Sequence, residues 1–85
     1  MQKFEYAIRD EAGLHARPAG LLVQKAKTFS GHIILSANGK ECEATRLFAL
    51  MGMCIRCGTV VTVTVSGEDE ARFVKELEAF FRANF

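Results

Sequence analysis

A run of β-branched residues, Val60-Val61-Thr62-Val63-Thr64-Val65, constrains the fold more than any other part of the chain. Branching at Cβ restricts side-chain rotation in a helix and suits a pleated strand, so the run predicts a strand. Segments 3–9 and 32–37 alternate apolar and polar side chains, as half-buried strands do. Segment 40–44 follows Asn38-Gly39, the dipeptide that favours a two-residue type I′ hairpin turn, and it predicts a short fourth strand.

Three helices are expected between and after these strands. Apolar residues recur at helical spacing over 19–29, and Pro18 is tolerated in a first turn, so it fixes the start of this helix close to His15. A brief helix is predicted over 46–51, with Thr45 as its N-cap. A last helix with one apolar face is predicted, and the segment 66–70 supplies its cap and acidic first turn.

The element order β-α-β-β-α-β-α predicts the fold class. Helices with one apolar stripe and strands with one apolar face are best satisfied by an α+β open-faced two-layer sandwich. In that fold the helices pack on one face of a four-stranded antiparallel sheet, and the other face meets water. No repeat, linker or low-complexity run divides the chain, and its length allows one core, so we expect a single domain over residues 1–85.

Charge and hydropathy argue against several classes of partner. Lys and Arg number 11 against 10 for Asp and Glu, and a net charge of +1 gives no general attraction to nucleic acid or to an anionic membrane. No stretch is long and apolar enough to span a bilayer, and the N-terminus lacks the residue order of a secretory signal. We therefore expect a cytoplasmic protein without nucleic-acid or membrane partners.

The three cysteines are expected to be reduced thiols, because an odd count without an export signal argues against a disulfide scaffold. Cys42 is predicted to lie in the core. Cys54 and Cys57 have the spacing of a redox motif, which makes a thiol-based sensor one alternative function. No second cysteine pair accompanies them and His32 has no second ligand at suitable spacing, so we expect no metal and no cofactor.

The segment Gly-Leu-His-Ala-Arg-Pro-Ala-Gly, residues 13–20, carries the strongest chemical signal. It puts His15 and Arg17 at the start of the first predicted helix, where free N–H groups and the helix dipole favour an anion. Neutral imidazole is a competent nucleophile near neutral pH, and an arginine can hold two phosphate oxygens. The pattern predicts that His15 accepts a phosphoryl group and that Arg17 stabilises it, although a lone His-x-Arg would favour two ordinary surface side chains.

The same segment resembles the active-site signature of HPr, the histidine-containing phosphocarrier family of the bacterial phosphoenolpyruvate:sugar phosphotransferase system. The chain length, the element order, Asn38-Gly39-Lys40 and the segments 58–62 and 67–70 also resemble that family. The resemblance implies that enzyme I phosphorylates His15 on Nδ1 using phosphoenolpyruvate, and that His15 passes the group to IIA domains of sugar permeases. It implies a carrier with a covalent phosphohistidine rather than a stand-alone enzyme.

A carrier that serves both a donor and an acceptor needs an open docking face rather than a deep pocket. The positions that match partner-contacting residues of the family lie on the first helix and in the short helix, and Arg46 is added as a contact for an acidic partner: Gly20, Leu21, Gln24, Lys27, Arg46, Leu47, Phe48 and Met51. By pattern alone the three apolar residues of the short helix fit the core better, and the resemblance favours a mixed role. No exposed apolar seam indicates permanent self-association, so we expect a monomer.

Two positions depart from the family pattern. Arg46 stands where many members carry a serine that a dedicated kinase phosphorylates, so we expect that control to be absent. Ala12 stands where members often place a small polar residue, which predicts one hydrogen bond fewer beside the imidazole. The alternative function is an HPr-like regulatory module that docks partner proteins without phosphate relay, and the presence of His15 and Arg17 favours the relay.

Overall fold

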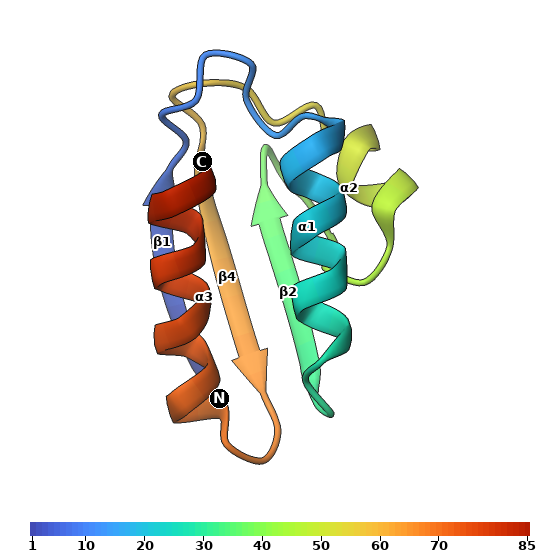
Figure 1. Ribbon diagram of the computed structural model, residues 1–85. Helices are drawn as coiled ribbons and strands as arrows, with labels where there is room; N and C mark the ends of the chain where they lie inside the picture. The colour runs from blue at the N-terminus through green and yellow to red at the C-terminus, as the bar shows by residue number, and fades with distance from the viewer.

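The computed structural model describes residues 1–85 (Figure 1). The elements, in chain order, are β1 (Gln2–Ala7), α1 (Ala16–Lys27), β2 (His32–Ala37), β3 (Lys40–Glu43), α2 (Leu47–Gly52), β4 (Val60–Ser66) and α3 (Glu70–Asn84). The order is the predicted one, and α1 and α3 lie on the same face of a single sheet. The prediction of an open-faced two-layer α+β sandwich is confirmed.

β4 is the strand on which the sheet is built. The strands are ordered β1-β4-β2-β3, and every neighbouring pair is antiparallel. Val63 in the middle of the β-branched run pairs with Phe4 of β1 on one side and with Leu35 of β2 on the other. Both edges of β4 are hydrogen-bonded, and its alternate residues Val61, Val63 and Val65 are fully buried because they face the helices.

The turn between β2 and β3 has the predicted geometry. The φ angle is 55° at Asn38 and 75° at Gly39, and two consecutive positive values are those of a type I′ turn. β3 ends one residue earlier than predicted, at Glu43. The next residue, Ala44, is buried and donates its N–H to the carbonyl of Ile33 at 2.8 Å, which draws the chain back toward the core.

α1 starts at Ala16, next to His15, as Pro18 predicted, and Pro18 occupies the third helical position, just before the apolar stripe that begins at Ala19. α2 starts after Arg46, which is its N-cap without a side-chain capping bond, so the predicted cap at Thr45 is wrong. The N–H of Arg46 donates to the carbonyl of Glu43 at 3.2 Å, and because of this turn the helix begins only at Leu47. No helix of the protein has the length and apolarity to span a membrane.

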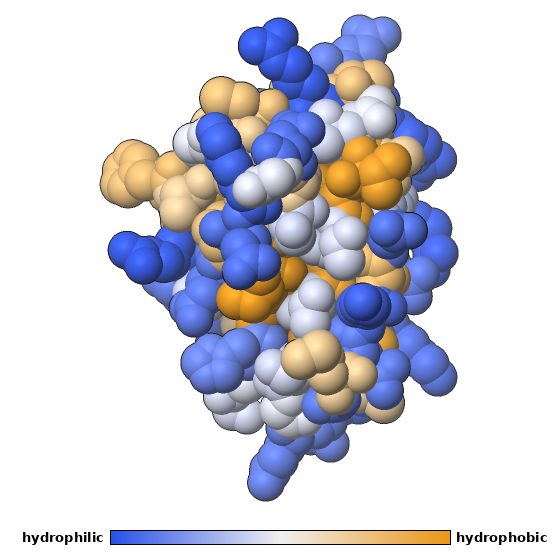
Figure 2. All heavy atoms as spheres, turned by 180° about the vertical axis from the view of Figure 1, so that it is seen from behind, coloured by the Kyte–Doolittle hydropathy of each residue, from blue (hydrophilic) through white to orange (hydrophobic).

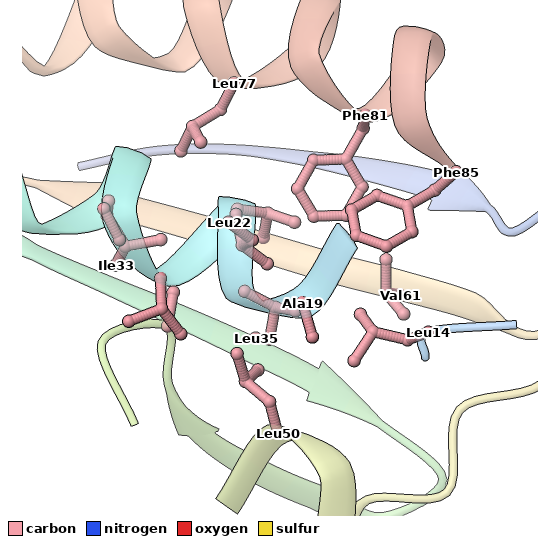
Figure 3. Packing of buried hydrophobic residues seen from close by; sticks show 14 of the residues in the cluster. Leu14, Ala19, Leu22, Ile33, Leu35, Leu50, Val61, Leu77, Phe81 and Phe85 are labelled. Atoms are coloured by element: carbon pink, nitrogen blue, oxygen red, sulfur yellow. The ribbon is translucent and has the colours of Figure 1, made fainter. Parts of the chain in front are cut away.

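One hydrophobic core fills the space between the sheet and the helices (Figure 3). It holds 22 buried residues, and no polar side chain is buried with them. The ring of Phe81 from α3 is fully buried and meets Phe4 and Tyr6 of β1 edge-on, with centroids 5.6 and 5.7 Å apart. Leu22 of α1 and Leu50 of α2 reach the same core. All three helices are therefore held on one face of the sheet.

The opposite face of the sheet carries no helix (Figures 1 and 2). Hydrophilic and neutral side chains cover most of this face, with small hydrophobic areas between them. Thr62 and Thr64 of β4 lie half-buried at its centre, and the exposed side chains of Lys3 and Glu5 flank them on β1. The alternation along β1 and β4 thus sends apolar residues to the helices and polar ones outward.

Substitution by alanine at one buried and one exposed phenylalanine tests how much core packing contributes to stability. Phe81→Ala removes a ring that is 0% exposed, and we expect a loss of about 3–5 kcal/mol in the free energy of unfolding. Phe48→Ala truncates a ring that is 89% exposed and should change it by less than about 0.5 kcal/mol. Urea unfolding followed by far-ultraviolet circular dichroism measures both, and equal losses would contradict the packing described above.

Candidate functional site

His15 is the N-cap of α1, and this position defines the candidate site. Its backbone is extended (φ −100°, ψ 174°), and its carbonyl accepts the first helical hydrogen bond, from Ala19 at 3.0 Å. The N–H groups of Ala16 and Arg17 therefore have no acceptor within the helix, and Pro18 has no N–H to offer. No acidic residue lies in the first turn. The imidazole is 39% exposed and lies next to a positively polarised helix end.

Asp10 contacts the histidine, and the sequence analysis missed it. Its Oδ2 lies 3.3 Å from Nε2 of His15, and its Oδ1 accepts the N–H of Ala12 at 2.9 Å. The hydrogen bond from the Ala12 N–H, and then the one from His15, hold the pKa of the Asp10 carboxyl below its ordinary value. The carboxylate is therefore ionised at neutral pH. An aspartate in a loop often accepts the backbone N–H of the second residue after it, which forms an Asx-turn, and this propensity could have drawn attention to Asp10.

Arg17 lies beside the histidine on a shallow surface hollow of about 260 Å³. Its exposed guanidinium makes no hydrogen bond or ion pair within the protein, so it is free to bind an anion. The hollow lies where the N-terminus of α1 meets the C-terminus of α3 (Figure 1). Its lining comes from both helices and from the loop before α1: Asp10, His15, Arg17, Pro18, Leu21, Ala83 and Asn84. The contribution of α3 could not be seen in sequence.

The loop that carries His15 is fixed by backbone contacts from two other segments. The N–H of Leu14 donates to the carbonyl of Ile55 at 2.9 Å, and the side chains of Leu14 and Ile55 are both buried. At the other end of the loop, the backbone oxygen of Phe85 accepts the N–H groups of Arg9 and Asp10 at 2.6 and 2.8 Å. The loop is held from both sides, so the candidate site is largely pre-formed.

The predicted docking residues lie on α1 and α2, which are neighbours in the fold (Figure 1). On α1, Leu21 is 45% exposed, and Gln24 and Lys27 are exposed while Gly20 is half-buried. Around α2, Arg46 and Phe48 are exposed, the latter at 89%, Met51 is 37% exposed, and Leu47 is half-buried against the core. The short helix therefore divides its apolar residues between core and surface.

None of the three cysteine thiols belongs to a cluster of side chains that could bind a metal ion. Cys54 and Cys57 are exposed and free, and Sγ of Cys57 lies 3.6 Å from the carbonyl oxygen of Arg9. Cys42 is half-buried rather than fully in the core, its Sγ lies 3.3 Å from Sδ of Met53, and burial raises the pKa of its thiol. No cluster of three or more His, Cys, Asp or Glu side chains is placed to hold a metal ion.

Fold and site together define a class of protein: a small open-faced sandwich that presents one histidine at the N-terminus of its first helix. A family model described as the PTS HPr component phosphorylation site matches residues 2–83. The HPr-like protein Crh of Bacillus subtilis is 39% identical over 79 residues, 93% of this chain and 91% of Crh. The phosphocarrier protein HPr of Haemophilus influenzae is 42% identical over 67 residues, 79% of each chain. The chain belongs to the HPr family of phosphotransferase-system phosphocarriers.

Solved structures agree with this assignment. The histidine-containing phosphocarrier protein of a Mycoplasma matches with a TM-score of 0.92 and 33% identity, over 96% of this chain and 93% of that one. HPr of Thermoanaerobacter tengcongensis gives the same TM-score, at 33% identity over 100% and 96% of the two chains. Dimers are described for Crh of Bacillus subtilis, with a swapped domain, and for HPr of Thermoanaerobacter tengcongensis.

Two glycines near the site should respond in opposite ways to an added methyl group. Gly13 has a φ of 69°, and a Cβ there would lie 2.4 Å from the carbonyl oxygen of Ile55, so Gly13→Ala should lose at least about 1 kcal/mol of stability. Gly20 is helical with nothing within 4 Å of an added Cβ, and Gly20→Ala should gain about 0.5–1 kcal/mol. Denaturant unfolding measures both variants, and a neutral Gly13→Ala would contradict the close approach of these two loops.

Proposed function

We propose that this protein is a cytoplasmic carrier of a bacterial sugar phosphotransferase system. It accepts a phosphoryl group on His15 from enzyme I and delivers that group to IIA domains of sugar permeases. The observation that carries the proposal is the position of His15 as the half-exposed N-cap of α1, next to two free backbone N–H groups. Membership of the HPr family supports the choice of donor and acceptor.

The chemistry requires a nucleophile and an anion site at the same place. Nδ1 of His15 makes no hydrogen bond within the protein, whereas Nε2 faces Asp10. Attack by the Nδ1 lone pair forms an N–P bond, and the bond from phosphorus to the donor breaks with its electron pair remaining on the donor. The Ala16 and Arg17 N–H groups and the Arg17 guanidinium stabilise the phosphoryl oxygens. In the second transfer the acceptor is the nucleophile: it attacks phosphorus, the N–P bond breaks, and the electron pair returns to Nδ1 of His15.

The docking face joins apolar and basic groups. Leu21, Phe48 and Met51 expose hydrophobic side chains, and the exposed Arg17 in the first turn of α1 and Arg46 at the N-cap of α2 add positive charge. This composition suits partners with an apolar patch bordered by carboxylates. A carrier that meets a donor and acceptors in turn needs this face free, so we propose that the working form is a monomer.

A regulatory module that docks partners without relaying phosphate is the second candidate. The observation that favours it is the 39% identity to Crh, which is an HPr-like protein associated with catabolite repression. Both candidates use the same docking face, and they differ in whether His15 receives a phosphoryl group.

Labelling distinguishes the two functions. Incubation with enzyme I and phosphoenolpyruvate should add the mass of one acid-labile phosphoryl group to the wild type. His15→Ala should remain unmodified. His32→Ala is the matched control, because this second histidine is exposed at the start of β2 and should be dispensable. If the wild type stays unmodified under conditions that label another HPr, the relay function is ruled out and the docking module is the function that stands.

Phe48→Ala tests the docking face. Because the ring is 89% exposed and contributes little to stability, its loss should leave the fold intact. Removal of a protruding aromatic contact should weaken binding to enzyme I about tenfold. Titration calorimetry gives the affinity, and Val60→Ala is the control, since Val60 is exposed on the sheet away from α1 and α2. Equal affinities for wild type and Phe48→Ala would place docking elsewhere.

A further inference from the structure

The contact between Asp10 and His15 points to a role that depends on the proposed phosphocarrier function and adds to it. We propose that Asp10 is a positioning residue for phosphoryl transfer. Its carboxylate receives the Nε2–H of His15, and this keeps the lone pair of Nδ1 available for the incoming phosphorus.

The donor and acceptor chemistry of the two side chains assigns the proton. An ionised carboxylate only accepts hydrogen bonds, so a contact with Nε2 requires that Nε2 carry the hydrogen. A neutral imidazole with its proton on Nε2 has its lone pair on Nδ1. The separation of 3.3 Å is at the long end for a hydrogen bond, as is common for catalytic contacts before the partner binds.

Asp10 is held in place by its own backbone and side-chain contacts. Its N–H donates to the oxygen of Phe85 at 2.8 Å, and its carbonyl accepts the N–H of Gly13 at 2.9 Å. Oδ1 takes the N–H of Ala12 at 2.9 Å, which leaves Oδ2 to face the imidazole. The carboxylate is therefore pre-organised, and little conformational entropy is lost when it orients the ring.

The charge balance of the transfer gives Asp10 a second effect. When Nδ1 bonds to phosphorus and the donor leaves with its electron pair, Nε2 keeps its proton. The ring then carries a positive charge that it did not have before. The Asp10 carboxylate faces this charge from the side opposite the phosphoryl group, so it stabilises the charged ring while Arg17 and the helix N-terminus stabilise the phosphoryl oxygens.

The closing experiment compares the wild type with Asp10→Asn and Asp10→Ala. Asparagine retains an oxygen for the Ala12 N–H and turns an N–H₂ group toward Nε2, which favours the tautomer with the proton on Nδ1. Long-range ¹H–¹⁵N spectra of the imidazole, recorded at a pH of about 8.5 where an ordinary histidine is neutral, report the two tautomers directly. We expect a higher fraction of the Nδ1–H form in Asp10→Asn than in the wild type, and an intermediate fraction in Asp10→Ala.

Kinetics complete the test. The second-order rate constant for phosphorylation by enzyme I should fall about fivefold in Asp10→Ala and further in Asp10→Asn. Glu11→Gln, which removes an exposed neighbouring carboxylate without a hydrogen bond or ion pair, should match the wild type in both readouts. Identical tautomer populations in the wild type and both Asp10 variants would overturn the inference. A wild type that takes up no phosphoryl group would overturn the proposed function instead, because the spectra need no phosphoryl donor.

Discussion

The pairing of β4 on both of its edges is the constraint from which the rest of the structure follows. A strand hydrogen-bonded to β1 and β2 has no free edge, and its alternate valines must be covered from one side. α1 and α3 provide that cover, and they pack against the same face. Because the chain enters α1 and leaves α3 at the same end of the sheet, the N-terminus of one helix and the C-terminus of the other come together there.

The fold was predictable because its signals are local. The β-branched run fixes a strand through side-chain rotamers, and Asn38-Gly39 fixes a hairpin through backbone sterics, so neither depends on the remainder of the chain. The start of α1 next to His15 was predictable from Pro18, whereas the start of α2 was not. The cap expected at Thr45 failed because a turn from Glu43 to Arg46 was equally compatible with the sequence.

The residues of the candidate site likewise differ in whether local sequence could predict them. His15 and Arg17 are adjacent to the helix start in sequence, so their combination could be predicted from a few residues. Asp10 and Ile55 reach the site through loop geometry and tertiary contacts. The Asx-turn propensity of Asp10 was a local signal for the loop but not for its contact with His15, and the residue type of Ile55 gave no signal. The apolar pattern of a six-residue helix is too short to show which side faces the core, so only the family resemblance indicated that Phe48 is exposed.

An anion bound at the helix end beside His15 would affect the stability of the first turn of α1. The ligands that the backbone offers there are amide N–H groups, which neither gain nor lose protons over the physiological range. Their orientation exists only while the first turn of α1 is wound, so fraying of that turn removes the ligands of the anion. An anion held there would slow the fraying. The phosphorylation state of His15 would thus alter how often the first turn of α1, the helix that runs alongside β2, opens locally.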